Sequence, residues 1–67
     1  DPANQRRRWA LDQLGSGHQL RREDLEKQFG VSPRTAKRDF QAMRDAGEVE
    51  FVGPAKTGHY RRVATPR

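Results

Sequence analysis

The segment from Val31 to Gly47 constrains the fold of this chain most, because it combines a helix start, a two-faced helix and a helix stop. Ser32 suits the N-cap position, since its hydroxyl can accept from a backbone N–H that the first helical turn leaves unpaired. Pro33 follows at the first helical position, where its missing N–H costs nothing. Gly47 readily adopts the left-handed conformation that ends many helices. These signals predict a helix over residues 32–46.

This predicted helix has two chemically different faces. At about 100° per residue, Ala36, Phe40 and Met43 fall on one side. The opposite side carries polar and basic side chains: Arg34, Lys37, Arg38 and Gln41. The first face suits a hydrophobic core, and the second suits an anion or the edges of nucleic-acid bases.

A shorter helix is predicted just before it, over residues 22–29. Leu25 and Phe29 are four residues apart and therefore lie on one stripe of that helix. Glu23 and Asp24 occupy its first turn, where the helix dipole favours acidic side chains. Only residues 30–32 separate the two predicted helices. Such a short connection is typical of a helix-turn-helix.

The first helix is predicted over residues 5–14, after a flexible lead-in at residues 1–5. Two glycines around Ser16 end this helix, because they favour turn geometry. Leu20 follows in a segment that suits a very short strand. Trp9 lies beside the apolar stripe of the helix, where it either completes the core or docks onto another part of the parent protein.

After Gly47 the apolar residues recur at every second position, as in a half-buried β-strand. Residues 53–58 are predicted to form a loop with turn residues at both ends, and residues 59–63 to return as an antiparallel strand. The last residues, 64–67, are predicted to be a flexible tail or linker. The chain is thus predicted to be mostly α with a small β-hairpin, a three-helix winged helix-turn-helix spanning residues 6–63.

Both periodicities, that of the helices and that of the strand, select one set of apolar positions for a single core. The predicted core residues are Ala10, Leu11, Leu14, Leu20, Leu25, Phe29, Val31, Ala36, Phe40, Met43, Val49 and Phe51.

The charge balance favours a polyanionic partner. The 67 residues contain 14 Lys and Arg against 9 Asp and Glu, which leaves a net charge of +5. There are no cysteines and only two histidines, so no disulfide, metal site or cofactor is expected. No run is long and apolar enough to cross a membrane. A charge-rich chain without cysteine fits the reducing cytoplasm, so a cytoplasmic protein is expected.

Double-stranded DNA is held mainly by Lys and Arg side chains, hydroxyls and helix N-termini. Arg34 and Lys37 are the best candidates for the major groove, because they combine reach with donor chemistry. The alternative is that the basic side chains of this helix face are simply exposed to water. Likewise, the predicted loop at residues 53–58 could be a flexible charged segment that does not contact DNA. The full set of predicted DNA contacts is Ser32, Arg34, Thr35, Lys37, Arg38, Gln41, Lys56, Thr57 and Arg61.

Four residues of the helix and hairpin have competing interpretations. Thr35 suits contact with DNA, a local backbone bond of its hydroxyl, or packing against the preceding helix. Arg38 has two acidic neighbours, Asp39 and Asp45, that can engage it. Asp39 is expected to orient an arginine or tie helices together rather than to touch DNA, because phosphates repel a carboxylate. Tyr60 is expected in the core of the hairpin.

The chain carries the pattern Leu25-x3-Phe29-Gly30-Val31-Ser32-x2-Thr35-x2-Arg38-Asp39-Phe40, followed by Gly47 and a short strand. This pattern resembles the winged helix-turn-helix of DeoR-type bacterial transcription regulators, and the resemblance covers residues 7–63. Two features depart from it, since Ala36 stands where many members have Ile, and residues 53–60 replace a glycine-rich wing. The Gly-x-Tyr ending of that loop is also similar to winged-helix modules appended to larger regulatory or enzymatic proteins.

The resemblance implies a DNA-binding module of a bacterial transcription regulator, with the helix 32–46 in the major groove and the basic wing, residues 53–62, on the DNA backbone. The alternative is a protein-interaction or regulatory module of a larger enzyme or signalling protein. The chain begins with Asp1 rather than Met, so we expect a domain of a longer protein, with any oligomerisation made by its other parts. No nucleophile–base set is present, and no enzymatic activity is expected.

Overall fold

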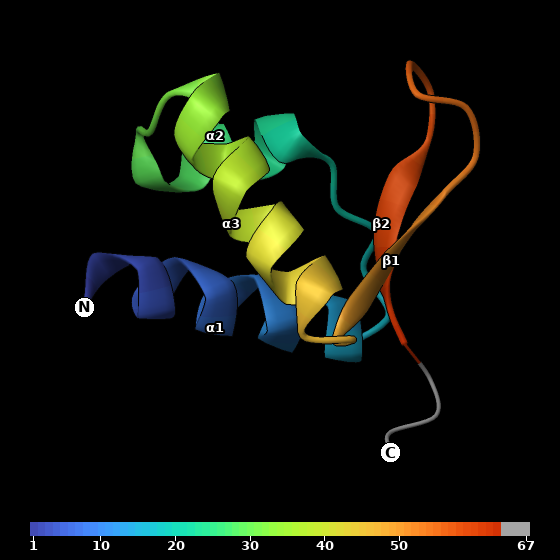
Figure 1. The fold of residues 1–67 in the computed structure, drawn as a ribbon, viewed down its shortest axis with the longest axis horizontal. Coiled ribbons are helices and arrows are strands. Elements are labelled where there is room, and N and C mark those ends of the chain that lie inside the picture. Colours follow the sequence, from blue (N-terminus) through green and yellow to red (C-terminus); the bar gives the residue numbers. More distant parts are fainter. Residues whose placement is uncertain (64–67) are drawn as a thin grey trace.

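Three helices are followed by one hairpin, as the sequence predicts (Figure 1). A computed structural model of the chain describes residues 1–63, and the predicted tail at residues 64–67 lies outside them. The two strands pair antiparallel, so the predicted fold class, a mostly helical three-helix winged helix, is confirmed. In chain order the elements are α1 (Pro2–Gly15), α2 (Arg22–Phe29), α3 (Pro33–Asp45), β1 (Val49–Val52) and β2 (His59–Arg62).

The start of α1 was predicted too late. The helix begins at Pro2 rather than near Gln5, so residues 1–5 form a helix cap and a first turn in place of a lead-in. The Asp1 carboxylate accepts a hydrogen bond from the Ala3 backbone N–H at 3.0 Å. An aspartate at the N-cap followed by proline is the same start signal that Ser32 and Pro33 give α3.

The bounds of α2 and α3 agree with the prediction. Gly30 ends α2 in the left-handed conformation, with φ of 64°. The Ser32 hydroxyl accepts from the Thr35 backbone N–H at 3.2 Å, which is the predicted N-cap bond. Gly47 follows α3 with φ of 74°. The local signals at both ends of the helix-turn-helix therefore act as expected.

The hairpin is fixed both in register and against the helices. Phe51 lies opposite Tyr60, and Val49 opposite Arg62. Leu20 forms an isolated bridge to Tyr60, whose backbone N–H donates to the Leu20 carbonyl at 2.7 Å. The predicted short strand near Leu20 is thus a single bridge. It places the start of α2 beside the returning strand β2.

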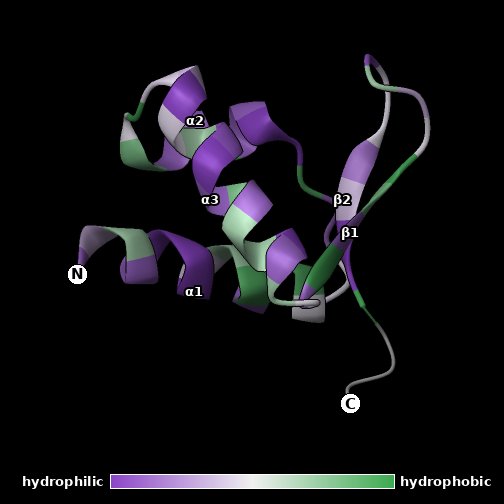
Figure 2. Cartoon of the chain, viewed as in Figure 1, coloured by the Kyte–Doolittle hydropathy of each residue, from purple (hydrophilic) through white to green (hydrophobic). Residues whose placement is uncertain are grey.

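One core lies where the helices and the base of the hairpin meet, and Figure 2 shows hydrophobic residues of α1 and β1 gathered there. The predicted Leu11, Phe29 and Val31 are only partly buried and pack against this core, while Phe51 is half-buried. Trp9 meets Phe29 edge-on at 5.6 Å between ring centroids, so it helps to complete the core. The buried apolar residues are Ala10, Leu14, Leu20, Leu25, Ala36, Phe40, Met43 and Val49.

An aromatic column connects the core to the hairpin surface. Phe40 of α3 stacks on Tyr60 with ring centroids 4.0 Å apart and ring planes 7° from parallel. Phe51 meets the same Tyr60 ring edge-on at 5.0 Å. The edge-on pair has a geometry that aromatic rings favour. Tyr60 therefore serves the hairpin core, as predicted.

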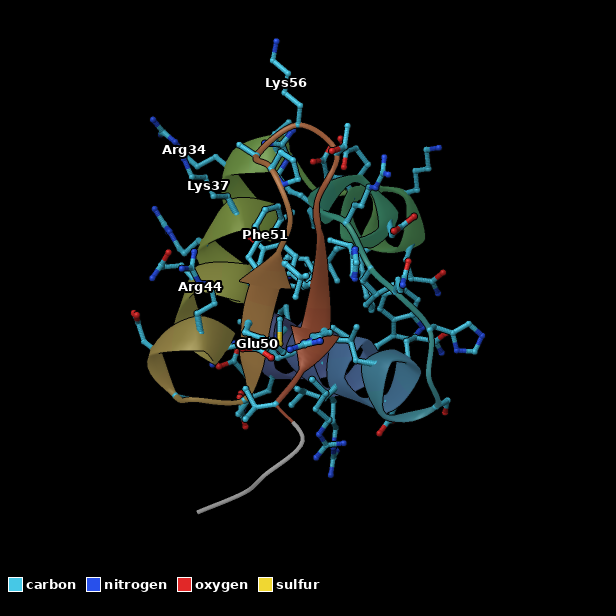
Figure 3. The ribbon with its side chains drawn as sticks, turned by 90° about the vertical axis from the view of Figure 1, so that its right-hand side faces the viewer. Arg34, Lys37, Arg44, Glu50, Phe51 and Lys56 are labelled. Carbon is cyan, nitrogen blue, oxygen red and sulfur yellow. The ribbon has the colours of Figure 1, made fainter. Side chains whose placement is uncertain are left out.

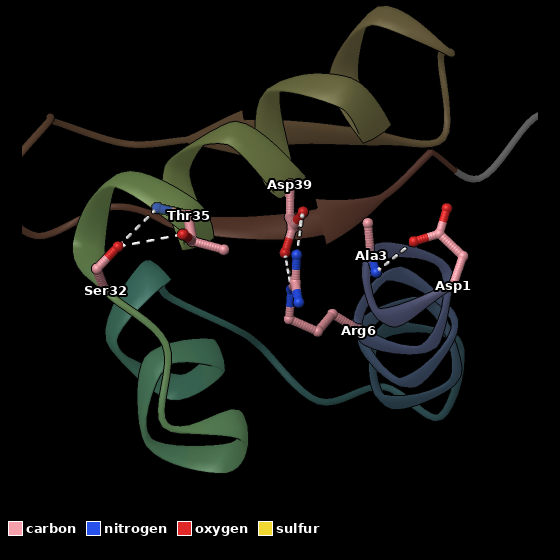
Figure 4. A network of polar contacts seen from close by, with 6 residues as sticks. All are labelled: Asp1, Ala3, Arg6, Ser32, Thr35 and Asp39. Atoms are coloured by element: carbon pink, nitrogen blue, oxygen red, sulfur yellow. Dashed lines mark hydrogen bonds and ion pairs between the residues drawn. The ribbon is translucent and has the colours of Figure 1, made fainter.

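A buried ion pair ties α1 to α3 (Figure 4). The Arg6 guanidinium donates to both carboxylate oxygens of Asp39, through Nε to Oδ2 and through Nη2 to Oδ1, the latter at 3.3 Å. The side chain of Asp39 is 5% exposed, and that of Arg6 15%. This hydrogen bond raises the pKa of Arg6 above its ordinary value. The expectation that Asp39 ties helices together is confirmed.

Within residues 1–63, no helix combines the length and apolar character that a membrane crossing requires.

Candidate nucleic-acid interface

The outer face of α3 presents a basic surface to solvent. Arg34, Lys37, Arg38 and Gln41 are all exposed, and they line one shallow hollow together with Ala42 and Asp45. The predicted helix-borne cations therefore share a face. The Gln41 amide donates to the Asp45 carboxylate at 2.9 Å, which satisfies part of its hydrogen-bonding capacity within the helix.

Arg38 is free of the acidic neighbours that were expected to engage it. Asp39 points inward to Arg6, and Asp45 accepts from Gln41. Within residues 1–63, Arg38 takes part in no ion pair. The predicted local competition for Arg38 was therefore wrong, because helical periodicity turns Asp39 to the opposite face of α3.

The hydroxyls at the start of α3 bond to each other. Ser32 Oγ donates to Thr35 Oγ1 at 3.1 Å, in addition to capping the Thr35 N–H (Figure 4). The Thr35 hydroxyl thus bonds a neighbouring side chain rather than the backbone, and the hydroxyl pair lies at the positive end of the helix dipole. Both residues define the helix start, so their first role is structural.

The hairpin loop places Lys56 at its tip. In Figure 3, Lys56 projects from the tip beyond the hairpin, at the same end of the molecule as Arg34 and Lys37 of α3. The loop is closed by a hydrogen bond from the Gly58 N–H to the Pro54 carbonyl at 2.7 Å. Thr57 is exposed, and its carbonyl accepts from the Arg21 guanidinium at 3.5 Å.

Arg61 lies apart from this group. It pairs across the strands with Glu50, at 2.6 Å between Nε and Oε2. Figure 3 shows Glu50 near the base of the hairpin, at the opposite end from Lys56. Its neighbour Arg62 lies against the end of α1, with Nη1 only 2.9 Å from where a side chain on Gly15 would begin. Of the predicted wing residues, Lys56 lines a groove together with Lys37 of α3, whereas Thr57 and Arg61 do not.

A groove between α3 and the hairpin contains three cations that the predicted contact set omits, namely Arg21, Arg22 and Arg44. Arg44 could have been found, because it lies seven residues after Lys37 and therefore on nearly the same helix face. The arginines at the start of α2 gave no comparable signal, since they reach the groove only through the bridge between Leu20 and Tyr60.

The residues described, 1–63, contain no group of His, Cys, Asp or Glu side chains arranged to hold a metal ion.

Comparisons with known proteins support the fold. No protein-family model matches the chain, and no curated protein matches it. The chain is similar in structure to the DIP2311 protein from Corynebacterium diphtheriae, with a TM-score of 0.83 and 30% sequence identity. The match covers 91% of this chain and 11% of that protein. This chain therefore spans only a small part of the length of the DIP2311 protein.

Proposed function

We propose that this domain is the DNA-binding module of a bacterial transcription regulator of the DeoR type, acting in the cytoplasm on double-stranded DNA. In this proposal α3 enters the major groove and the hairpin loop lies on the DNA backbone. The observation that carries it is the group of exposed cations Arg34, Lys37 and Arg38 on the outer face of α3, with Lys56 at the hairpin tip at the same end of the molecule.

The distribution of ion pairs supports this assignment. Within residues 1–63, the three ion pairs involve Arg6, Arg22 and Arg61, and none uses a cation of α3. No acidic side chain of the described residues therefore neutralises the basic side chains of the outer face, which can interact with an anionic partner. Phosphate groups of a duplex would satisfy several of them at once, with release of bound counterions.

The alternative, a protein-interaction module, has less support. Such a module needs an apolar docking patch, for which Trp9 of α1 and Val52 of β1 are the candidates. Both residues are half-buried, and the described part of the chain exposes no large hydrophobic side chain. A basic and largely hydrophilic surface favours a nucleic acid over an apolar protein partner.

Binding to a random-sequence duplex over a range of salt concentrations tests the proposal. If the domain contacts about four phosphates, the logarithm of the association constant should fall with the logarithm of salt concentration at a slope of about −3.6. Lys37→Ala should reduce the magnitude of this slope by about one. Lys27→Ala provides a matched control, because Lys27 is exposed on α2 and lines a different hollow.

Absence of duplex binding at low salt would refute the proposal. Binding that does not vary with salt would refute it as well, because phosphate contacts must release counterions. An equal effect of Lys27→Ala and Lys37→Ala would show that net charge, rather than the α3 face, determines affinity.

A further inference from the structure

The groove between α3, the start of α2 and the hairpin has the features of a small-ligand site. Its volume is about 330 Å³, at the lower end of the range of about 300–1,000 Å³ found for small-molecule sites. Phe51 and Tyr60 supply aromatic surface, and Glu23 is the one carboxylate among its lining residues. Five cations surround them: Arg21, Arg22, Lys37, Arg44 and Lys56.

The aromatic surface of the groove is held in place by the fold. Tyr60 is stacked on the fully buried Phe40 and contacts the edge of Phe51. The Phe51 ring also passes so close to Gly58 that a Cβ there would lie 2.6 Å from two ring carbons. Only glycine allows this approach without a shift of the ring. A ligand therefore meets a preformed aromatic surface.

The charge in the groove is largely unneutralised. Lys37, Arg44 and Lys56 take part in no ion pair within residues 1–63. Arg22 is paired with Glu26, and Arg21 donates to a carbonyl of the hairpin loop. Phe51 of β1 lines the groove together with the first three of these cations, and Figure 3 shows their side chains. An aromatic surface beside free cations suits a ligand with both a planar ring and a phosphate.

We propose that this groove binds a nucleoside phosphate, with its base against Phe51 and its phosphates held by Lys37, Arg44 and Lys56. A bare phosphate would leave the aromatic surface unused, and an uncharged nucleoside would leave the cations unused. Lys37 and Lys56 also belong to the proposed DNA interface, so the bound nucleotide excludes DNA. This competition rests on the proposed function, whereas binding of the nucleotide does not.

Calorimetric titration of the 67-residue chain with ADP, pyrophosphate and adenosine tests the proposal. ADP should bind about tenfold more tightly than pyrophosphate, because only ADP adds stacking of a base on an aromatic ring. Phe51→Leu should remove this difference, and Phe51→Tyr should retain it. Adenosine should bind more weakly than ADP, because it lacks the charge-assisted contacts of the phosphates.

A matched pair of charge changes on α3 locates the site without risk to the core. Arg44→Gln should weaken ADP binding about fivefold, since it removes one charge-assisted contact. Arg38→Gln removes the same charge from the same helix but outside the groove, and should leave ADP affinity within about twofold. Thermal unfolding of each variant shows whether the fold is retained.

Separate measurements distinguish this proposal from the proposed function. No ADP binding, equal affinity for ADP and pyrophosphate, or equal effects of Arg44→Gln and Arg38→Gln would overturn the nucleotide site. Duplex binding at low salt, measured without nucleotide, tests DNA binding alone. Displacement of the duplex by ADP supports the competition, whereas a ternary complex would overturn it and leave both separate activities in place.

Discussion

The charged side chains on the two sides of α3 have opposite environments. On the inner side, Asp39 is 4% exposed and is paired with Arg6, and it lies between fully buried apolar residues such as Phe40. On the outer side, Arg34 and Lys37 are exposed and make no ion pair within residues 1–63. The comparison indicates that the buried carboxylate of Asp39 fixes the position of the helix, whereas the exposed cations are available to a partner.

The ion pairs show the same contrast in their burial. The side chains of Arg6 and Asp39 are 15% and 5% exposed, whereas those of Arg61 and Glu50 are 59% and 47% exposed. Water competes with an exposed pair but cannot replace a lost partner in a buried one. The four predictions below use this difference, beginning with the inner side of α3.

The largest expected effect is on the core. Phe40→Ala should lower the free energy of unfolding by about 3–5 kcal/mol, because it removes a fully buried ring and leaves a cavity beneath Tyr60. This is a large part of the stability expected for such a small domain. Denaturant unfolding followed by circular dichroism measures it. A variant that unfolds like the parent would contradict the observed register of α3.

The next effect concerns the buried ion pair. Arg6→Met should lower the free energy of unfolding by about 3 kcal/mol, because it leaves the Asp39 carboxylate buried without its partner. The double variant Arg6→Met/Asp39→Leu should regain most of this loss, since both charges are then absent. Chemical denaturation of the three proteins completes the comparison. Equal stability of single and double variants would show that the buried charge is not the cause.

The outer side should affect binding rather than stability. Arg34→Ala or Lys37→Ala should weaken binding to a cognate duplex by about 1–3 kcal/mol and narrow the preference over random DNA. Lys56→Ala should weaken cognate and random DNA equally and reduce the salt slope by about one. Unfolding free energies should change by less than about 0.5 kcal/mol in all three.

The cognate sequence for these measurements can be selected from a random duplex pool with the full-length parent protein. If Arg34→Ala and Lys37→Ala left cognate binding unchanged while Lys56→Ala abolished specificity, the hairpin would be the reading element. The roles of α3 and the hairpin would then be reversed.

The smallest effect is expected at the base of the hairpin. Arg61→Ala should change the free energy of unfolding by at most about 1 kcal/mol, because its ion pair with Glu50 is well exposed to water. It should also reduce duplex affinity less than Lys56→Ala, since Arg61 is already paired with Glu50, at the end of the hairpin opposite Lys56. A larger loss of duplex binding in Arg61→Ala would extend the interface to the hairpin base.

The elements of this protein could be predicted from the sequence because their signals are local. Ser32 caps α3 through an N–H three residues away, and Gly30 and Gly47 end helices through their own conformations. The missed start of α1 was also encoded locally, in Asp1 and Pro2. Helical periodicity alone predicted which cations lie on the outer face of α3, because it depends only on residues within two or three helical turns of each other.

Only the tertiary structure decided which distant groups meet. Asp39 directly follows Arg38 in the sequence, yet its partner is Arg6, 33 residues away. Arg21 and Phe51 share a groove because the Leu20–Tyr60 bridge brings the hairpin against the start of α2. Periodicity states which way a side chain faces on its own element, but not what packs opposite it. That choice is made by the relative placement of the elements, which depends on the packing of the whole core.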